Sequence, residues 1–300
     1  MRFTFEGALP VRSPYRLDLT VYALRRLAGN VVDLFDERGI YRRALHAGRG
    51  INVVEVRQTG ARSLHVRIAG PQPRAQLAIV ERMLGTCSDM REWEKRVAPF
   101  PWLKELAREV RGLRPPRYPT LWEASANAIV FQQISIHAAA AIMRRLIEAL
   151  SPPVALDGLR SHPFFTEAQL LAAKERPLAN AGLSANKIAH LRSAAETFFG
   201  TRIESELREL SSDDAAGRLR AIRGIGPWSA ALILLRGLGR LDVFPLRDSG
   251  VARSLQLLSG QEHVDAEGLL EALGPVRGML YFHLLLGRLR NLAAAGSIHA

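Results

Sequence analysis

The sequence predicts an α+β protein, with an N-terminal antiparallel β-sheet domain over residues 1–86 and an all-helical unit over residues 87–300. Apolar and polar residues alternate along 51–57 and 64–68, which is typical of a half-buried antiparallel sheet. After Pro71 and Pro73, apolar residues recur at spacings of three and four, as they do in packed helices. The change of period marks the boundary between the two parts.

In chain order, we expect strands at residues 3–6, 15–22, 39–47, 51–59 and 62–69. A helix from about 19 to 28, which ends at Gly29-Asn30, competes with the second of these strands. The expected helices beyond the sheet cover residues 75–84, 90–98, 101–111, 120–149, 167–173, 184–199, 211–222, 227–235, 249–258, 265–273 and 278–294. The proline-rich run from Arg114 to Pro119 is the clearest break between them.

Composition limits the class of protein. A chain of 300 residues that is 48% hydrophobic can bury a large core. No stretch approaches 18 uninterrupted apolar residues, and the first residues lack the apolar segment of a signal peptide, so we expect no membrane partner and a cytoplasmic, or in a bacterium nucleoid-associated, location. The single cysteine, Cys87, excludes an internal disulfide, a four-cysteine zinc site and a cysteine-ligated iron–sulfur cluster.

The charge of the chain favours a polyanionic partner. The formal net charge is +12. The segment from 215 to 260 contains seven arginines, no lysine or glutamate, and two aspartates; the arginines are Arg218, Arg220, Arg223, Arg236, Arg240, Arg247 and Arg253. Guanidinium groups suit phosphate oxygens. The alternative is that these arginines are scattered over exposed helix faces.

A glycine turn lies in the middle of this basic segment. The run Gly224-Ile225-Gly226 separates two apolar helical stretches, so residues 219–235 are expected to form helix, turn, helix. Because glycine reaches positive φ without a Cβ clash, this run predicts a tight turn with exposed amides. Pro227 suits the first position of the second helix, whose N-terminus favours an anion. The turn is therefore a candidate phosphate clamp.

Further motifs around this turn resemble a known family. They include the run from Gly224 to Ala230, the loop at 242–250 with Phe244-Pro245 and Asp248, and the Phe131-Gln132-Gln133 segment of the long helix. In this combination and order, the chain resembles the helix-hairpin-helix base-excision DNA glycosylases, and among them 3-methyladenine DNA glycosylase II. The resemblance covers residues 121–288 and implies a helical unit of two lobes around a basic cleft.

By this resemblance, Asp248 is the catalytic acid and Trp228 belongs to the base pocket. A carboxylate near the sugar stabilises the positive charge that develops as the glycosidic bond breaks, and it can steer a water molecule. An electron-rich ring can stack on a cationic alkylated purine. Taken alone, Asp248 also suits a helix N-cap before Ser249, and Trp228 suits a core position.

The resemblance also assigns DNA contacts. Gln133 is the candidate wedge that enters the space left by an extruded nucleotide, and Gln132 is a neighbouring contact, although adjacent helical glutamines commonly face solvent. The expected phosphate-binding residues are Arg223, Gly224, Ile225, Gly226 and Ser229. Lys187 and Arg277 are candidates for either phosphate or structural contacts. A monovalent cation, Na⁺ or K⁺, on the hairpin carbonyls is implied, with no other cofactor required.

The expected activity is monofunctional. Relatives that also cleave the backbone carry a lysine where this chain has Trp228, and tryptophan cannot form a Schiff base. Val276 and Leu232 replace aromatic residues of the family pattern, which leaves the lesion range open. We expect a monomer that binds damaged duplex DNA. Two alternatives stay open: a non-catalytic helix-hairpin-helix DNA-binding protein, and a glycosylase for oxidised or deaminated bases.

Overall fold

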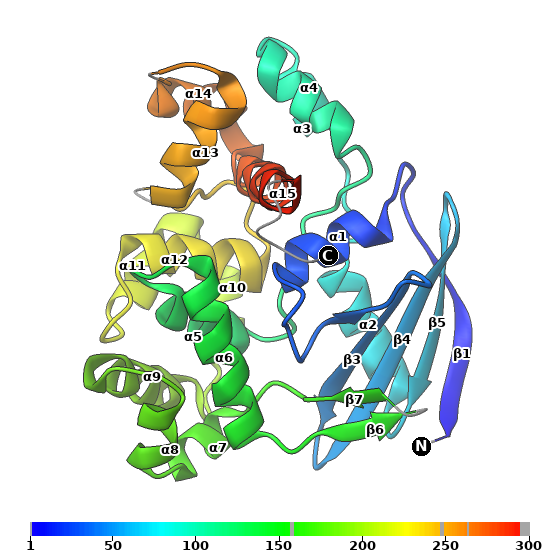
Figure 1. The fold of residues 1–300 in the computed structure, drawn as a ribbon, viewed down its shortest axis with the longest axis vertical. Coiled ribbons are helices and arrows are strands. Elements are labelled where there is room, and N and C mark those ends of the chain that lie inside the picture. Colours follow the sequence, from blue (N-terminus) through cyan, green and yellow to red (C-terminus); the bar gives the residue numbers. More distant parts are fainter. Residues whose placement is uncertain (1, 157–158, 247–248, 263, 295–300) are drawn as a thin grey trace.

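A five-stranded antiparallel sheet forms the N-terminal part of the computed structural model, which describes residues 2–156, 159–246, 249–262 and 264–294. The strand order is β1-β5-β4-β3-β2. The strands are β1 (Phe3–Pro10), β2 (Leu34–Phe35), β3 (Ile40–Ala47), β4 (Gly50–Gly60) and β5 (Ser63–Ala69). Helix α2 (Pro73–Met83) follows the last strand and packs beside the sheet (Figure 1). The predicted α+β class, with a sheet followed by helices, is confirmed.

The second predicted strand, at 15–22, is wrong. Residues Leu17–Arg25 form helix α1 instead, as the competing helical prediction had it. Leu17, Val21 and Leu24 are buried at spacings of four and three, so they lie on one helical face. The alternation of apolar residues from Tyr15 onward fits period two as well, and only packing distinguishes the two arrangements.

Helices account for most of the chain beyond the sheet, apart from a short hairpin of β6 (Val154–Leu156) and β7 (Leu159–Ser161). In Figure 1 they gather into two groups, one of α3, α4 and α13–α15 and one of α5–α12. The bounds are α3 (Arg91–Val97), α4 (Pro101–Glu109), α5 (Leu121–Phe131), α6 (Ile136–Leu150), α7 (Glu167–Ala172), α8 (Glu175–Asn180), α9 (Ala185–Phe198), α10 (Ile203–Glu209), α11 (Ser212–Arg220), α12 (Pro227–Ile233), α13 (Ser249–Ser259), α14 (Ala266–Leu273) and α15 (Gly278–Ala294).

The single helix expected over 120–149 is two helices. Helix α5 ends at Phe131, and Ser135 caps α6 by accepting a hydrogen bond from the amide of Ala138. Between them Gln133 adopts a left-handed conformation with φ of 57°. The interruption places both glutamines in a turn instead of on a helix face.

A buried ion cluster joins the sheet to the helices. Arg43 of β3 is paired with Asp33 at 2.7 Å and with Glu123 in the first turn of α5. Tyr41 donates a further hydrogen bond to Asp33. All four side chains are buried. Because an unpaired charge at such depth is strongly unfavourable, the cluster fixes the position of α5 relative to the sheet.

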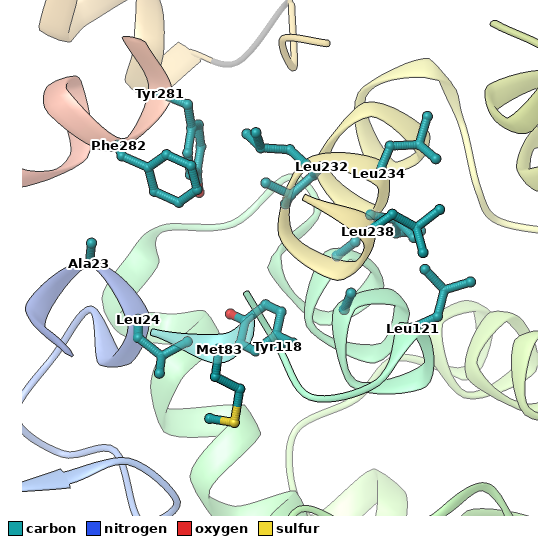
Figure 2. Close-up of a cluster of buried hydrophobic side chains, with 14 of the residues drawn as sticks. Ala23, Leu24, Met83, Tyr118, Leu121, Leu232, Leu234, Leu238, Tyr281 and Phe282 are labelled. Atoms are coloured by element: carbon teal, nitrogen blue, oxygen red, sulfur yellow. The ribbon is translucent and has the colours of Figure 1, made fainter. Parts of the chain in front are cut away.

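The hydrophobic core is continuous from the sheet domain to the helical unit. Figure 2 shows part of it, where Ala23 and Leu24 of α1 lie in one cluster with Leu232 of α12 and Phe282 of α15. Arg236 crosses the same junction. It lies in a π-helical turn (Leu234–Leu238) and donates to the carbonyls of Ala23 and Leu24 over 3.0 and 3.1 Å.

Among the described helices, none by itself is long and apolar enough to cross a membrane; the stretches Ala266–Val276 and Gly278–Arg290 meet the length and composition test only together, as a pair bent by 113°.

Candidate functional site

A cleft of about 1080 Å³ opens where the two groups of helices meet. Its lining comes from six separate segments: the end of α1, the α5–α6 turn, His190 of α9, the hairpin between α11 and α12, the beginning of α13, and one face of α15. Lining residues from most of these segments include Gln133, Gly226, Trp228, Val251 and Tyr281. Sequence elements that are far apart therefore contribute to one site.

The hairpin needs a glycine at only one of its two glycine positions. Gly224 has φ of 89°, and a Cβ there would lie 2.3 Å from Cγ of His190. Gly226 has an extended backbone with φ of −89°, and a Cβ there would meet nothing within 4 Å. The expectation of a glycine turn is correct, but positive φ explains only Gly224. The space beside Gly226 is open toward the cleft.

The predicted phosphate-binding residues divide into two sets. Arg223 and Gly226 are exposed, and within the described part of the chain the amide of Gly226 donates no hydrogen bond. By contrast, the amide of Ile225 donates to the carbonyl of Ile222 over 3.0 Å, and the Ile225 side chain is buried. The side chain of Ser229 is buried as well. Contact with a phosphate stays a prediction for all of them, and the geometry favours the exposed set.

The two predicted glutamines have different positions. Gln133 is exposed at the tip of the α5–α6 turn. Gln132 is half-buried, and its amide donates to the carbonyl of Gly224 over 2.8 Å and to Oγ of Ser229 over 2.7 Å. Gln132 thus holds the hairpin in place, which leaves Gln133 as the residue available to a partner.

Lys187 has a structural partner. Its ammonium group donates to the carbonyls of Val130 and Gln132 over 2.6 and 3.0 Å, at the C-terminus of α5. Burial lowers the pKa of Lys187 from its usual value. Lys187 was expected to contact either a phosphate or another part of the protein, and the structure shows the second kind of contact. Arg277 donates to the carbonyl of Gly274.

The apolar part of the cleft contains Trp228, Phe131, Leu232 and Tyr281. Trp228 is half-buried, so its ring is accessible from the cleft. Tyr281 is 8% exposed and belongs to the buried core, and it also lines the cleft. Its hydroxyl accepts a hydrogen bond of 3.3 Å from Arg26, a residue that sequence reasoning did not single out.

Asp248, the predicted catalytic acid, lies outside the described residues, as does Arg247. Helix α13 begins at Ser249, directly after Asp248 in the sequence, and Gly250 and Val251 of that helix line the cleft. Val276 is half-buried.

Arginine supplies the charge of the cleft. The charged groups among its described lining residues are Arg26, Arg220, Arg223, Arg253 and Arg288, with no carboxylate among them. Two arginines of the basic segment have other roles. Arg236 is fully buried, and Arg240 donates to carbonyls at the end of α10. The arginines on either side of the hairpin are therefore not all available at the surface to a partner.

Side chains suited to bind a metal do not gather in the described part of the chain, where no group of three or more histidine, cysteine, aspartate or glutamate residues occurs. A monovalent cation on the hairpin carbonyls would require other ligands. The carbonyl of Gly224 accepts from Gln132 and that of Ile222 accepts from Ile225, although each carbonyl oxygen has a second lone pair. The turn thus retains oxygen ligands for such an ion.

Comparison with known proteins places this fold and cleft in one class. Residues 126–274 match the family model described as HhH-GPD superfamily base excision DNA repair protein. The chain belongs to this superfamily. The letters HhH stand for helix-hairpin-helix, and in this chain α11, the glycine hairpin and α12 form such a motif.

Within it, the chain is similar to proteins named DNA-3-methyladenine glycosylase. That of Bacillus subtilis is 27% identical over 172 residues, which are 57% of each chain. That of Saccharomyces cerevisiae is 31% identical over 151 residues, which are 49% of each chain. The chain spans about half the length of the curated relatives it matches.

Two solved structures extend the likeness to almost the whole chain. The 3-methyladenine DNA-glycosylase from Archaeoglobus fulgidus has a TM-score of 0.80 at 24% identity, covering 93% of this chain and 97% of that one. The 8-oxoguanine glycosylase/lyase of Clostridium acetobutylicum, in complex with double-stranded DNA, has a TM-score of 0.75 at 17% identity, covering 97% and 100%. At these identities, the likeness is one of fold.

Proposed function

We propose that this protein is a DNA glycosylase of base excision repair that hydrolyses the N-glycosidic bond of alkylated bases, chiefly of the 3-methyladenine type, in duplex DNA. One observation carries the proposal: a single arginine-lined cleft gathers the hairpin, Trp228 and the first turn of the helix that follows Asp248. The names of the relatives support the same activity.

Binding would begin at the phosphates. The exposed Arg223 and the open edge at Gly226 face the cleft, and Arg253 and Arg288 line its other side. The glycosidic bond of a stacked base cannot be reached inside a duplex, so the nucleotide has to be extruded. Gln133, exposed at the tip of its turn, is suited to fill the space that the nucleotide leaves.

In the proposed reaction, the carboxylate of Asp248 faces the sugar of the extruded nucleotide. As the bond between base and sugar breaks, positive charge develops on the deoxyribose, and a nearby anion lowers that barrier. The same carboxylate orients a water molecule toward C1′. The products are a free base and an abasic site.

Trp228 supports a monofunctional enzyme. Its ring is accessible in the cleft and can stack on an electron-poor alkylated purine. It has no amine to attack C1′, so a Schiff-base intermediate at this position is not expected. The DNA strand would therefore stay intact after base release.

The experiment uses duplexes with a single alkylated purine and the variants Asp248→Asn and Asp242→Asn. Asp242 is exposed and does not line the cleft, so it is a matched control. Asp248→Asn should lose base release and retain DNA binding, whereas Asp242→Asn should retain both. Strand breaks should appear only after alkali. Full turnover by Asp248→Asn would contradict the mechanism, and breaks without alkali would contradict the monofunctional assignment.

The proposal also includes a monomeric protein in the cytoplasm, and a Na⁺ or K⁺ ion on hairpin carbonyls. Such an ion would strengthen the attraction of the turn for a phosphate.

A further inference from the structure

The imidazole of His190 lies against the backbone of the glycine hairpin. His190 belongs to α9 and lines the cleft. Its ring is so close to Gly224 that a Cβ on this glycine would lie 2.3 Å from Cγ and 2.7 Å from Cδ2 of the histidine. The same glycine is held through its carbonyl by Gln132. A ring in contact with a backbone that is itself held has little freedom to move, so His190 has a fixed place beside the turn.

The two ring nitrogens of His190 have different surroundings. In the described part of the chain, Nδ1 is buried and has no hydrogen-bond partner. Nε2 is not enclosed in this way, and no described group donates to it or accepts from it. Because His190 lines the cleft, Nε2 is the nitrogen that a molecule in the cleft can reach.

This difference determines where the neutral ring carries its proton. A neutral imidazole has a proton on one nitrogen and a lone pair on the other. A buried N–H without an acceptor is rare in folded proteins, because the group loses its hydrogen bond to water and gains none. A proton on Nε2 avoids such a group at Nδ1. The neutral ring therefore presents an N–H donor to the cleft.

The described polar groups next to this ring in the hairpin are donors as well. Arg220 and Arg223 lie shortly before Gly224 in the sequence, line the cleft and are exposed. The amide of Gly226 donates to no described group. The complement of several donors is a group with several acceptor oxygens, and the arginines favour a negative charge on it. In DNA that group is the phosphate, since a base edge carries donors and acceptors side by side.

We propose that His190 is an additional DNA contact, in which the Nε2–H of the neutral ring donates to a phosphate oxygen beside the hairpin. The inference rests on the DNA binding of the proposed function and adds to it a side chain from α9. The contact differs from those of the arginines in one respect. A neutral donor neutralises no phosphate and releases no counterion, so its contribution to affinity does not depend on salt.

The test measures binding to a duplex with a stable abasic-site analogue at about pH 8, where an ordinary imidazole is neutral. His190→Phe keeps a flat ring against Gly224 and removes the donor, so affinity should fall by about tenfold. The slope of log affinity against log salt should stay that of wild type, whereas the loss of a cationic contact lowers it by about 1. His190→Gln retains an N–H donor at similar reach and should recover most of the affinity.

His65→Phe is the matched control. His65 is half-buried like His190, but it lies on β5, is 3.0 Å from Glu6 and does not line the cleft. This variant should bind DNA as the wild type does. His190→Leu, which also lacks a donor, covers a failure of His190→Phe to fold, and thermal unfolding of each variant identifies a loss of structure.

Two results would overturn the inference. One is wild-type affinity in a folded His190→Phe or His190→Leu, or an equal loss in His190→Gln, because the donor would then make no difference. The other is a salt slope that is lower by about 1 in His190→Phe, which would show a charged histidine in the complex.

Base release by the wild-type protein, measured on a duplex with one alkylated purine, separates the inference from the enzymatic function. Release of the base together with unchanged binding by folded His190→Phe would overturn the role of His190 and leave the proposed function intact. A wild-type protein that releases no base, in a series where His190→Phe weakens binding as expected, would overturn the proposed activity and leave the phosphate contact supported.

Discussion

The side chain of Gln132 holds the backbone of Gly224, donating a hydrogen bond of 2.8 Å to its carbonyl oxygen. A second bond of 2.7 Å from the same amide reaches Oγ of Ser229, in the first turn of α12. The α5–α6 turn and the hairpin are thereby joined into one unit at the cleft. A change in the position of either segment should therefore shift the other.

The variant Gln132→Glu should separate the two segments. A carboxylate has the shape of the amide but no N–H to donate, and it would face the Gly224 carbonyl. We expect the free energy of unfolding to fall by about 1–3 kcal/mol and DNA affinity to fall with it. Urea unfolding and a DNA-binding titration measure the two effects.

Gln133→Glu is the matched control, because it places the same charge one residue further along on an exposed side chain. Its free energy of unfolding should stay within about 0.5 kcal/mol of wild type, while base release from duplex DNA should fall. Equal stability losses in the two variants would contradict the bracing role of Gln132.

The two hairpin glycines should respond differently to alanine. Gly224→Ala requires a left-handed alanine and a clash with the ring of His190, so we expect a loss of stability of about 1–3 kcal/mol or more. Gly226→Ala adds a methyl group in open space on an extended backbone, so stability should be unchanged. DNA affinity of Gly226→Ala should nevertheless fall, because the methyl group occupies the approach to an exposed amide.

The measurements are thermal unfolding and DNA titration on both glycine variants. A Gly226→Ala protein with wild-type stability and wild-type affinity would show that no phosphate approaches this edge of the turn.

Arg236 and Arg223 look alike in the sequence and should behave in opposite ways. Arg236 is fully buried, and it donates to the two α1 carbonyls and lies 4.6 Å from the Tyr118 ring centroid. Arg236→Met should cost about 3 kcal/mol of stability, because the α1 carbonyls lose charged donors. Arg223→Met should leave stability unchanged and lower the slope of log affinity against log salt by about 1.

Denaturant unfolding and binding at several salt concentrations separate these outcomes. A destabilised Arg223→Met with an unchanged salt slope would exclude Arg223 as a phosphate contact.

Patterning was enough to predict most helices and four of the five strands of the sheet, but not the short β2. The runs at 39–47, 51–59 and 62–69 correspond to β3, β4 and β5, since alternation with one buried face has few other solutions. The prediction of a strand at 15–22 was wrong because Leu17, Leu19 and Val21 also fit a helix that is buried on more than one side. The break of the long helix at Gln133 was missed because glutamine is a good helix former.

The cleft was predictable in part. The hairpin and Trp228 carry local signals in glycine spacing and residue type, and both line the cleft. Arg26 and Tyr281 do not carry such signals, because one depends on a left-handed backbone and the other on which side of α15 meets the cleft. A contact between residues separated by 255 positions is set by packing alone.

The buried His283 should make the fold sensitive to acid. It accepts a hydrogen bond of 3.1 Å from Nε1 of Trp93, and its Nδ1 donates to the carbonyl of Met279 over 2.9 Å. Burial lowers the pKa of His283 from 6.5 to about 4, since the charged form would lose its hydration. The unfolded chain thus binds more protons than the folded chain between these two values, so stability rises with pH across this window.

As pH falls from 6.5 to 4, this histidine should therefore remove about 3 kcal/mol of stability, at about 1.4 kcal/mol for each pH unit. His283→Asn, measured by urea unfolding at a series of pH values, should be less stable at neutral pH and show a flatter dependence through this window. His137→Asn changes an exposed histidine and should keep the wild-type pH profile. Parallel profiles for wild type and His283→Asn would mean that His283 is already protonated in the folded protein, against the acceptor role that its contact with Trp93 requires.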